Sequence, residues 1–170
     1  RQECDTILLS VGLIPENELT NEANIKIDNK TKGAVVSDRL MTSVDGVFAA
    51  GNVLHVHDLV DFVSEESEIA GLNAAKYIKG EFGLSDKESI EVKAEDGVSY
   101  TIPQYINYET MPESLTLRFR VNNVYPSRKI AAYADNEQIF SRKKRVLAPG
   151  EMESITIKKS DLKEDTKKIS

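Results

Sequence analysis

The chain has 170 residues, of which 40% are hydrophobic and 29% are charged, and its formal net charge is −6. This length allows one domain or two small ones with a buried core, and the composition is ordinary for a soluble globular protein. The acidic balance argues against nucleic acid as the main partner, because phosphate contacts need clustered cations. No apolar run approaches the roughly 18 residues that a membrane span requires, so we expect no membrane partner.

Charge is distributed unevenly along the chain. Residues 1–90 carry 8 Lys+Arg and 16 Asp+Glu, whereas residues 91–170 carry 14 and 12, which predicts two regions of different character. The one cysteine, Cys4, excludes an internal disulfide and favours a reducing, cytoplasmic location. The chain starts at Arg1 and enters an apolar run almost directly, so we interpret it as a piece of a longer chain.

The first predicted elements are a strand and a hairpin. The apolar run Thr6–Val11 predicts a buried strand that is broken by Gly12 and Pro15. Farther along, Ile25–Asp28 alternates with period two, NKTKG supplies turn residues, and Ala34–Val36 resumes the apolar pattern. These three segments predict a β-hairpin.

Residues 42–52 read TSVDGVFAAGN, and the N-terminal half is organised around this segment. Four apolar residues between Gly46 and Gly51 predict a short strand buried in a parallel sheet. Gly51 carries no Cβ at the carboxyl end of that strand, where ligands bind in open α/β sheets, and Asn52 adds a short hydrogen-bonding side chain. The pattern therefore predicts a binding site, with an ordinary buried strand and glycine turn as the alternative.

The same segment resembles the second flavin-binding signature of the pyridine nucleotide-disulfide oxidoreductases, a group that includes the thioredoxin-reductase-like members. That signature reads Thr-x-x-x-Gly, four apolar residues and Gly-Asp, and the chain matches it from Thr42 to Gly51. Asn52 stands where the family usually has an aspartate that hydrogen-bonds the ribityl and pyrophosphate part of FAD. Asparagine keeps a carbonyl acceptor and adds an NH₂ donor, so binding is still expected. The resemblance covers roughly residues 3–82.

The resemblance implies FAD as the cofactor and NAD(P)H as the hydride donor of a longer parent enzyme. It places the cofactor against Thr42, Gly46, Gly51, Asn52, Val53, Ser64 and Glu65. The sequence contains no GxGxxG and no CxxC motif. The isolated chain is therefore expected to retain FAD poorly and to be inactive, and its catalytic residues stay unknown.

A helix is predicted after this segment. Ser64 is a candidate N-cap, Glu65 and Glu66 fall in the first turn, and Gly80 and Gly83 are expected to end the helix. Its larger apolar contacts are predicted to come from Ile69, Leu72, Tyr77 and Ile78. In the family, the equivalent helix directs its N-terminus at the flavin pyrimidine ring. An amphipathic surface helix without a ligand is the alternative.

Two histidines precede the helix. His55 and His57, two apart on an extended segment, would point the same way and could ligate a metal together with Asp58 or Asp61. No third ligand of recognisable spacing follows, so we predict no metal and interpret both histidines as loop residues that line or shield a cofactor. A histidine near a flavin could also relay protons.

From residue 90 onward the pattern changes to period two. It predicts strands at residues 90–93, 99–106, 114–121, 130–134, 138–146 and 154–158. Short strands at this spacing are typical of a small antiparallel sandwich or barrel. The basic run Arg142–Arg145 is interpreted as a solvated strand edge.

The predicted fold class is α/β, with a partial FAD-binding Rossmann-like domain over residues 1–84 and a small all-β sandwich-like domain over residues 90–170. The predicted function is that of a fragment of an FAD-dependent NAD(P)H oxidoreductase, which passes hydride from nicotinamide to flavin and onward to an unknown acceptor. The alternative is a non-enzymatic interaction module whose β domain binds a protein partner. Unpaired strand edges predict self-association through residues 1–80 into a homo-oligomer.

Overall fold

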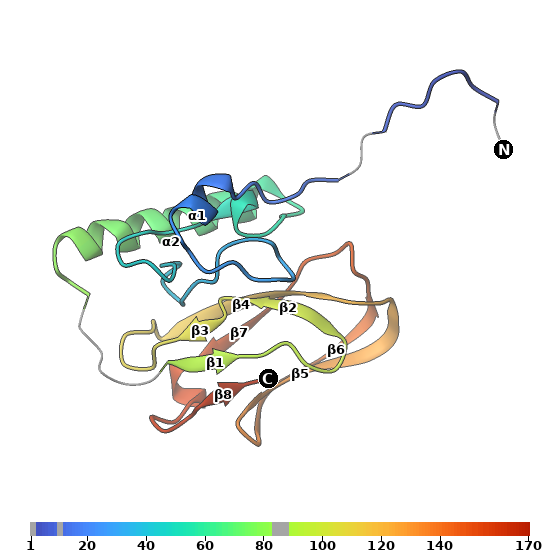
Figure 1. Cartoon of the computed structure of the whole chain (residues 1–170). Helices are drawn as coiled ribbons and strands as arrows, with labels where there is room; N and C mark the ends of the chain where they lie inside the picture. The colour runs from blue at the N-terminus through green and yellow to red at the C-terminus, as the bar shows by residue number, and fades with distance from the viewer. Residues whose placement is uncertain (1–2, 10–11, 83–88) are drawn as a thin grey trace.

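The computed structural model describes residues 3–9, 12–82 and 89–170. The described residues have mixed helix and sheet content, with the helices and loops of the first half lying over the strands of the second (Figure 1). The helical elements are α1 (Glu18–Glu22), the 3₁₀ turn η1 (Gly51–Val53), α2 (Val60–Ile78) and the 3₁₀ turn η2 (Lys159–Asp161). The strands are β1 (Ile90–Val92), β2 (Val98–Ile102), β3 (Tyr105–Ile106), β4 (Ser114–Val121), β5 (Tyr125–Ala134), β6 (Glu137–Leu147), β7 (Glu153–Lys158) and β8 (Lys168–Ile169).

The strands form two sheets that share one apolar core. One sheet has the order β3-β1-β8-β5-β6 and the other β2-β4-β7. Along β4 the buried residues alternate with more exposed ones, so Leu117, Phe119 and Val121 face inward. Strand β7 pairs with β4 and contributes Ile155 and Ile157 to the same core. Strands β1, β5 and β8 of the larger sheet close it with further buried apolar side chains. The alternation of buried and exposed residues along these strands thus agrees with the period-two pattern of the sequence.

Most of the predicted strands are confirmed, with differences where residues interrupt pairing. The prediction over residues 99–106 divides into β2 and β3 at Pro103, because proline has no N–H to donate to a ladder. Strand β5 begins at Tyr125 rather than at residue 130. Strand β8 was not predicted, since two residues carry no periodicity, and it runs parallel to β1. The larger sheet is therefore mixed rather than antiparallel.

The predicted N-terminal strand is wrong for the residues that the structure describes. Thr6–Leu9 is irregular, and Leu8 is 93% exposed. The segment leads away from the rest of the molecule (Figure 1). A buried parallel strand needs hydrogen-bonding neighbours on both sides, and none of the described strands lies beside this segment. Ser10 and Val11, the last residues of the prediction, lie outside the described residues.

The hairpin predicted over residues 25–36 is confirmed as a short one. Ile27 and Ala34 form an antiparallel bridge, and the Asp28 N–H donates to the Gly33 carbonyl at 2.9 Å. Gly33 lies directly against the backbone of Leu54, since an added Cβ would stand 1.8 Å from the Leu54 carbonyl oxygen. Only glycine allows this approach, which brings the hairpin against the segment that follows η1.

The apolar run between Gly46 and Gly51 does not form a strand of a parallel sheet, so that prediction is wrong. Phe48 makes one antiparallel bridge to Met41, and Val47 is 36% exposed. The run folds back onto the residues that precede it, with the Ala49 N–H donating to the Leu40 carbonyl at 3.0 Å. A local turn therefore satisfies its backbone groups, because no parallel neighbour is available among the described strands.

Helix α2 begins five residues earlier than predicted, because its N-cap is Leu59 rather than Ser64. Leu59 is its N-cap, and Ser64 lies inside the helix, where its Oγ donates to the Val60 carbonyl at 3.2 Å. The predicted end at Gly80 is confirmed: Gly80 has φ +70°, and the Glu81 N–H donates to the Lys76 carbonyl at 2.9 Å. These bonds are those of a Schellman cap. Gly83 lies outside the described residues.

The packed face of α2 is not the predicted one. Its buried residues are Glu66 and Ala70, whereas Ile69, Leu72 and Ile78 are 43%, 57% and 83% exposed. The prediction that these large apolar side chains anchor the helix is therefore wrong. The small side chain of Ala70 lets the helix lie close to the loops beneath it. Among the described residues, no helix is both long and apolar enough to cross a membrane.

A second core joins the two halves of the chain. Its buried members are Ile25, Ala34, Val36, Leu40, Leu54, Ala70 and Ile102. Ile102 comes from β2, so the second half completes the core of the first. Gln104 adds a polar link, because its Oε1 accepts from the Val36 N–H at 2.9 Å and its own N–H donates to the Val36 carbonyl at 3.1 Å. Of the predicted boundary at residues 85–89, residues 85–88 lie outside the described residues, so the division stays a prediction.

Candidate functional site

Three ionisable side chains meet where the loop after η1 passes beneath α2. The Nε2 atom of His55 lies 3.1 Å from one carboxylate oxygen of Glu66, and the Nε2 atom of His57 lies 3.0 Å from the other. The two imidazole centroids are 4.2 Å apart. His55 and Glu66 are each 1% exposed and His57 is 9% exposed. We call these three residues the His–Glu cluster.

Local backbone geometry explains why the three residues converge. Gly51, at φ +74°, starts η1 and turns the chain so that His55 and His57 follow under the helix. Residues two apart on an extended segment point the same way, which directs both imidazoles to one side. Glu66 lies at the centre of the packed face of α2, four residues before Ala70. The loop and the helix therefore each contribute part of the cluster.

Backbone hydrogen bonds fix the orientation of the cluster. The Gly51 N–H donates to Oε2 of Glu66 at 2.6 Å, which holds the carboxylate plane. Oδ1 of Asn52 accepts from the His57 N–H at 3.1 Å and so closes the loop. With these bonds in place, neither carboxylate oxygen depends on solvent for its hydrogen bonds.

Arg120 of strand β4 also holds the loop that carries His55 and His57. Arg120 donates to the Val56 carbonyl at 3.0 Å and to Oδ1 of Asp58 at 2.5 Å. The other oxygen of Asp58 accepts from the Met152 N–H at 2.6 Å. The histidine loop is thus tied to the second half of the chain on both sides of His57.

The charge state of the cluster follows from burial and hydrogen bonding. Burial alone would raise the pKa of Glu66, but the hydrogen bonds from His55 and His57 outweigh burial and lower the pKa to about 2. Burial lowers the pKa of His55, which favours the neutral imidazole. A carboxylate that accepts hydrogen bonds requires N–H donors, so the network assigns a proton to Nε2 of both imidazoles. Each Nδ1 is buried, and neither has a hydrogen-bond partner in the part of the chain that the structure describes.

The first three predicted cofactor residues shape turns. Thr42 is buried, and its Oγ1 accepts from the Val44 N–H at 3.2 Å. Gly46 has φ +77°, and an added Cβ would lie 2.9 Å from the ring of Tyr77. Gly51 bonds directly to the His–Glu cluster through Glu66, as Asn52 does through the His57 N–H.

The remaining four predicted cofactor residues lie on two elements. Asn52 is exposed on η1, and the Val53 carbonyl accepts from the Asn17 side chain at 2.9 Å. Ser64 is not the N-cap of α2, because the helix starts at Val60. Glu65 pairs with Arg118 of β4 at 2.9 Å. The structure therefore gives Ser64 a contact within α2 and Glu65 a contact with β4.

Glu66 is the residue that sequence reasoning missed as a partner of the histidines. The sequence placed it in a polar first turn, where a carboxylate is ordinarily solvated. One available signal was its spacing, since Glu66 lies four residues before Ala70, which puts the two side chains on one face of a helix. The true helix start, which moves Glu66 into the second turn, strengthens that signal.

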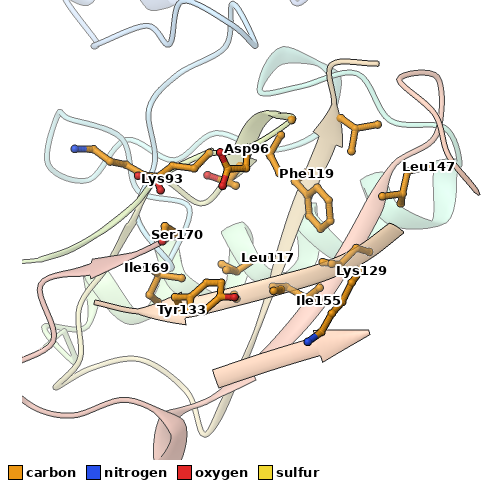
Figure 2. Close-up of a pocket in the computed structure, with 18 of the residues that line it drawn as sticks. Lys93, Asp96, Leu117, Phe119, Lys129, Tyr133, Leu147, Ile155, Ile169 and Ser170 are labelled. Atoms are coloured by element: carbon orange, nitrogen blue, oxygen red, sulfur yellow. The ribbon is translucent and has the colours of Figure 1, made fainter. Parts of the chain in front are cut away.

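A cavity of about 330 Å³ lies apart from the cluster, between the two sheets of the second half. Figure 2 shows Leu117, Phe119 and Ile155 from the smaller sheet facing Tyr133 and Ile169 from the larger one. Charged side chains of Lys93, Asp96 and Lys129 also line it. None of the three cluster residues is among the described residues that line this cavity.

Comparison with known proteins identifies a relationship for the first half. Residues 1–75 match the family described as Pyridine nucleotide-disulphide oxidoreductase. The chain is 43% identical over 53 residues to a mitochondrial dihydrolipoyl dehydrogenase of Caenorhabditis elegans, an alignment that covers 31% of this chain and 11% of that protein. It is 28% identical over 103 residues to the mitochondrial dihydrolipoyl dehydrogenase of Pisum sativum, covering 60% and 19%. The same identity and length relate it to a leghemoglobin reductase of Glycine max, covering 60% and 18%.

These comparisons support a pyridine nucleotide-disulfide oxidoreductase origin for the matched segment. The chain spans 19% or less of the length of these three curated relatives. No solved structure matches the chain. The relatives are oxidoreductases by name, which supports an enzyme family and, through that family, a flavin cofactor.

Proposed function

We propose that this chain is part of the flavin-binding region of an FAD-dependent oxidoreductase. The observation that carries the proposal is the family match over residues 1–75, which includes the whole segment from Thr42 to Asn52. The proposed enzyme takes hydride from NAD(P)H and passes electrons to an acceptor of unknown identity. The signature resembles that of the thioredoxin-reductase-like members, and we keep that group as the proposed subtype.

Asn52 suits a polar contact with the cofactor. Its side chain is exposed, while its carbonyl oxygen accepts from the His57 N–H and so holds the amide in one orientation. The NH₂ group of asparagine donates two hydrogen bonds, which match hydroxyl and phosphate oxygens of the ribityl-phosphate part of FAD. Gly51 beside it has φ +74°, a backbone conformation that leaves no Cβ at this point.

The residues of this chain would bind and orient the cofactor rather than react. When bound, a flavin supplies the two-electron redox chemistry, and the protein positions it. Thr42 and Gly46 hold the turn that precedes Gly51, and Asn52 contributes the polar contact. Ser64 and Glu65 stay in the proposed site only through their place on α2, because their side chains bond to Val60 and Arg118.

The purified chain should bind FAD weakly, because no GxGxxG segment is present to hold the pyrophosphate. Titration of FAD, followed by quenching of flavin fluorescence, should give a Kd well above about 1 μM. A Kd near or below that value would contradict the proposed distribution of binding contacts.

Purification of the proposed longer protein distinguishes the flavoprotein proposal from the alternative of an interaction module. The longer protein should be yellow when purified and show the absorption of bound flavin. A colourless protein that instead copurifies with a stoichiometric protein partner would favour the interaction module.

A further inference from the structure

We propose that the His–Glu cluster binds one divalent transition-metal ion, with Zn²⁺ the best match, and that the ion fastens the histidine loop to α2. The cluster offers one ligand atom from each of His55, His57 and Glu66, and these atoms lie within 4.8 Å of one another. Two imidazoles and one carboxylate form a ligand set that zinc uses in proteins. The proposal does not depend on the flavin proposal, since it uses no contact with FAD.

The distances in the cluster are close to those that zinc requires. Tetrahedral coordination with bonds of about 2.0–2.1 Å separates neighbouring ligand atoms by about 3.3 Å. The Nε2 atom of His55 lies 3.1 Å from one Glu66 oxygen, the Nε2 atom of His57 lies 3.0 Å from the other, and the three ligand atoms lie within 4.8 Å of one another. Binding of the ion therefore requires side-chain rotation that brings the three ligand atoms to the tetrahedral spacing.

Charge also favours a cation at this place. The Glu66 carboxyl group is 1% exposed, and its hydrogen bonds come from two imidazoles and the Gly51 amide. Burial of a carboxylate costs several kcal/mol unless an opposite charge compensates it. In the described structure, Arg118 and Arg120 pair instead with Glu65 and Asp58. A dication between the three ligands supplies the compensating charge.

Metal binding requires a proton shift within each imidazole. Coordination through Nε2 requires each neutral imidazole to carry its proton on Nδ1. The shift exchanges the two Nε2–H hydrogen bonds to Glu66 for Nε2–metal bonds, and it places each proton on an Nδ1 that has no hydrogen-bond partner in the described part of the chain. Gly51 continues to orient the carboxylate in both states, as outer hydrogen bonds do in metal sites.

The identity of the ion follows from ligand type. Imidazole suits zinc, copper, iron and nickel, whereas magnesium and calcium prefer sites made only of oxygen ligands. A buried, preformed site with three protein ligands leaves a fourth position for water or a further group. We therefore expect Zn²⁺ and Co²⁺ to bind, and Mg²⁺ not to compete.

The test is titration of Zn²⁺ into the metal-stripped chain by calorimetry, with a Co²⁺ titration followed by visible absorption. We expect one ion per chain and Co²⁺ bands of a four-coordinate site. Nuclear magnetic resonance of the histidine side chains should show the proton move from Nε2 to Nδ1 at both His55 and His57. Absence of saturable binding, or a tautomer that Zn²⁺ leaves unchanged, would overturn the proposal.

Substitution of the proposed ligands tests whether the ion binds at this cluster. His55→Ala and His57→Ala should each weaken Zn²⁺ binding at least about 100-fold, since loss of a ligand exceeds the 10–100-fold cost of losing an outer partner. Glu68→Gln, on the exposed side of the same helix, is the matched control and should change affinity less than about twofold. Circular dichroism checks that each variant folds. If a histidine variant is unfolded, the tautomer measurement on the native chain decides; a folded one that binds as tightly as the native chain overturns the assignment.

Discussion

Glu66 controls the local conformation through both of its carboxylate oxygens. One oxygen accepts from His55, and the other accepts from His57 and from the Gly51 amide. Removal of a charged hydrogen-bonding partner from a buried group costs more than the same change at the surface, because the remaining group is left unpaired. A single side chain of α2 therefore bonds to the loop from Gly51 to His57 at three points.

Asn52 gives the most direct test of the proposed flavin contact. In the proposed flavoprotein parent, Asn52→Ala should weaken FAD binding by about 1–3 kcal/mol, because a polar group of the cofactor loses its partner. The measurement is the FAD dissociation constant after reconstitution of the apoprotein. Asn52→Asp is the control and should retain FAD, since it restores the residue usual in the resembling family. Equal FAD retention by Asn52→Ala would remove this residue from the site.

Asp38 should make stability depend on pH. Burial raises the pKa of this carboxyl above its usual value, although the Asn107 N–H donates to Oδ1 at 3.1 Å. Oδ2 is buried with no partner among the described residues. A raised pKa in the folded state means that the contribution of Asp38 to stability is full below its unfolded pKa and is lost as pH rises through the folded value.

Asp38→Asn keeps the acceptor for Asn107 and removes the buried charge. The variant should therefore gain free energy of unfolding relative to the native chain as pH rises from about 4 to about 7. Urea denaturation at both pH values measures the difference. Asp45→Asn, at an exposed turn, should stay within about 0.5 kcal/mol of the native chain at both. A gain for Asp38→Asn that is larger at the lower pH contradicts the assignment.

At the level of residues, the sequence identified the two histidines but not their partner. The spacing of His55 and His57 is visible along the chain, and so is the glycine-bounded segment before them. Glu66 could not be recognised in the same way, because its burial depends on where α2 begins and which face it packs. Leu59 caps the helix without a side-chain bond, so no N-cap pattern marks the true start.

Two glycines on different elements should respond oppositely to alanine. Gly33→Ala places a Cβ 1.8 Å from the Leu54 carbonyl oxygen, and a backbone atom cannot yield cheaply. We expect a loss of about 3 kcal/mol or more in the free energy of unfolding. Gly71→Ala, within α2, meets nothing within 4 Å and should gain about 0.5–1 kcal/mol from helix propensity.

Urea unfolding followed by circular dichroism measures both glycine variants. Gly71→Ala serves as the matched control, because it makes the same chemical change without the contact. Equal effects at the two positions would show that the hairpin can move away from Leu54 without cost.

At the level of elements, local patterns predicted antiparallel structure well and parallel structure poorly. Strand β6 pairs with β5, the strand directly before it, and alternation along β4 and β7 identifies the inner faces of those two strands. The apolar runs at residues 6–11 and 47–50 were interpreted as parallel strands. Such a strand depends on distant neighbours, so a local pattern cannot establish that those neighbours are present.

The molecule has two hydrophobic cores, and only one of them is built from a single half of the chain. The core between the two sheets is built from residues of the second half alone, 15 of them buried. The smaller core needs Ile102 from β2, and Asp38 and Val36 also bond to residues 104–107. The second half therefore has the means to fold alone, whereas the first half depends on it.

Residues 89–170 expressed alone should give strand-type circular dichroism and a cooperative urea transition, because about 80 residues can form a single-core domain. Residues 1–84 alone should lack a cooperative transition. In the intact chain, Ile102→Ala should cost about 2–5 kcal/mol through the smaller core. A folded first half beside an unfolded second half would refute this order of dependence.

The bonds of Asp58 and Arg120 have a consequence for hydrogen exchange. The Met152 amide donates to Asp58, 94 residues earlier in the chain, so it can exchange with solvent only after that contact opens. Arg120 holds the neighbouring Val56 carbonyl, and release of the histidine loop must break both bonds. The exchange rate of the Met152 amide therefore reports how often the histidine loop opens, although Met152 is not adjacent to that loop in sequence. Any ligand that closes the loop should slow deuterium uptake at this one amide between β6 and β7.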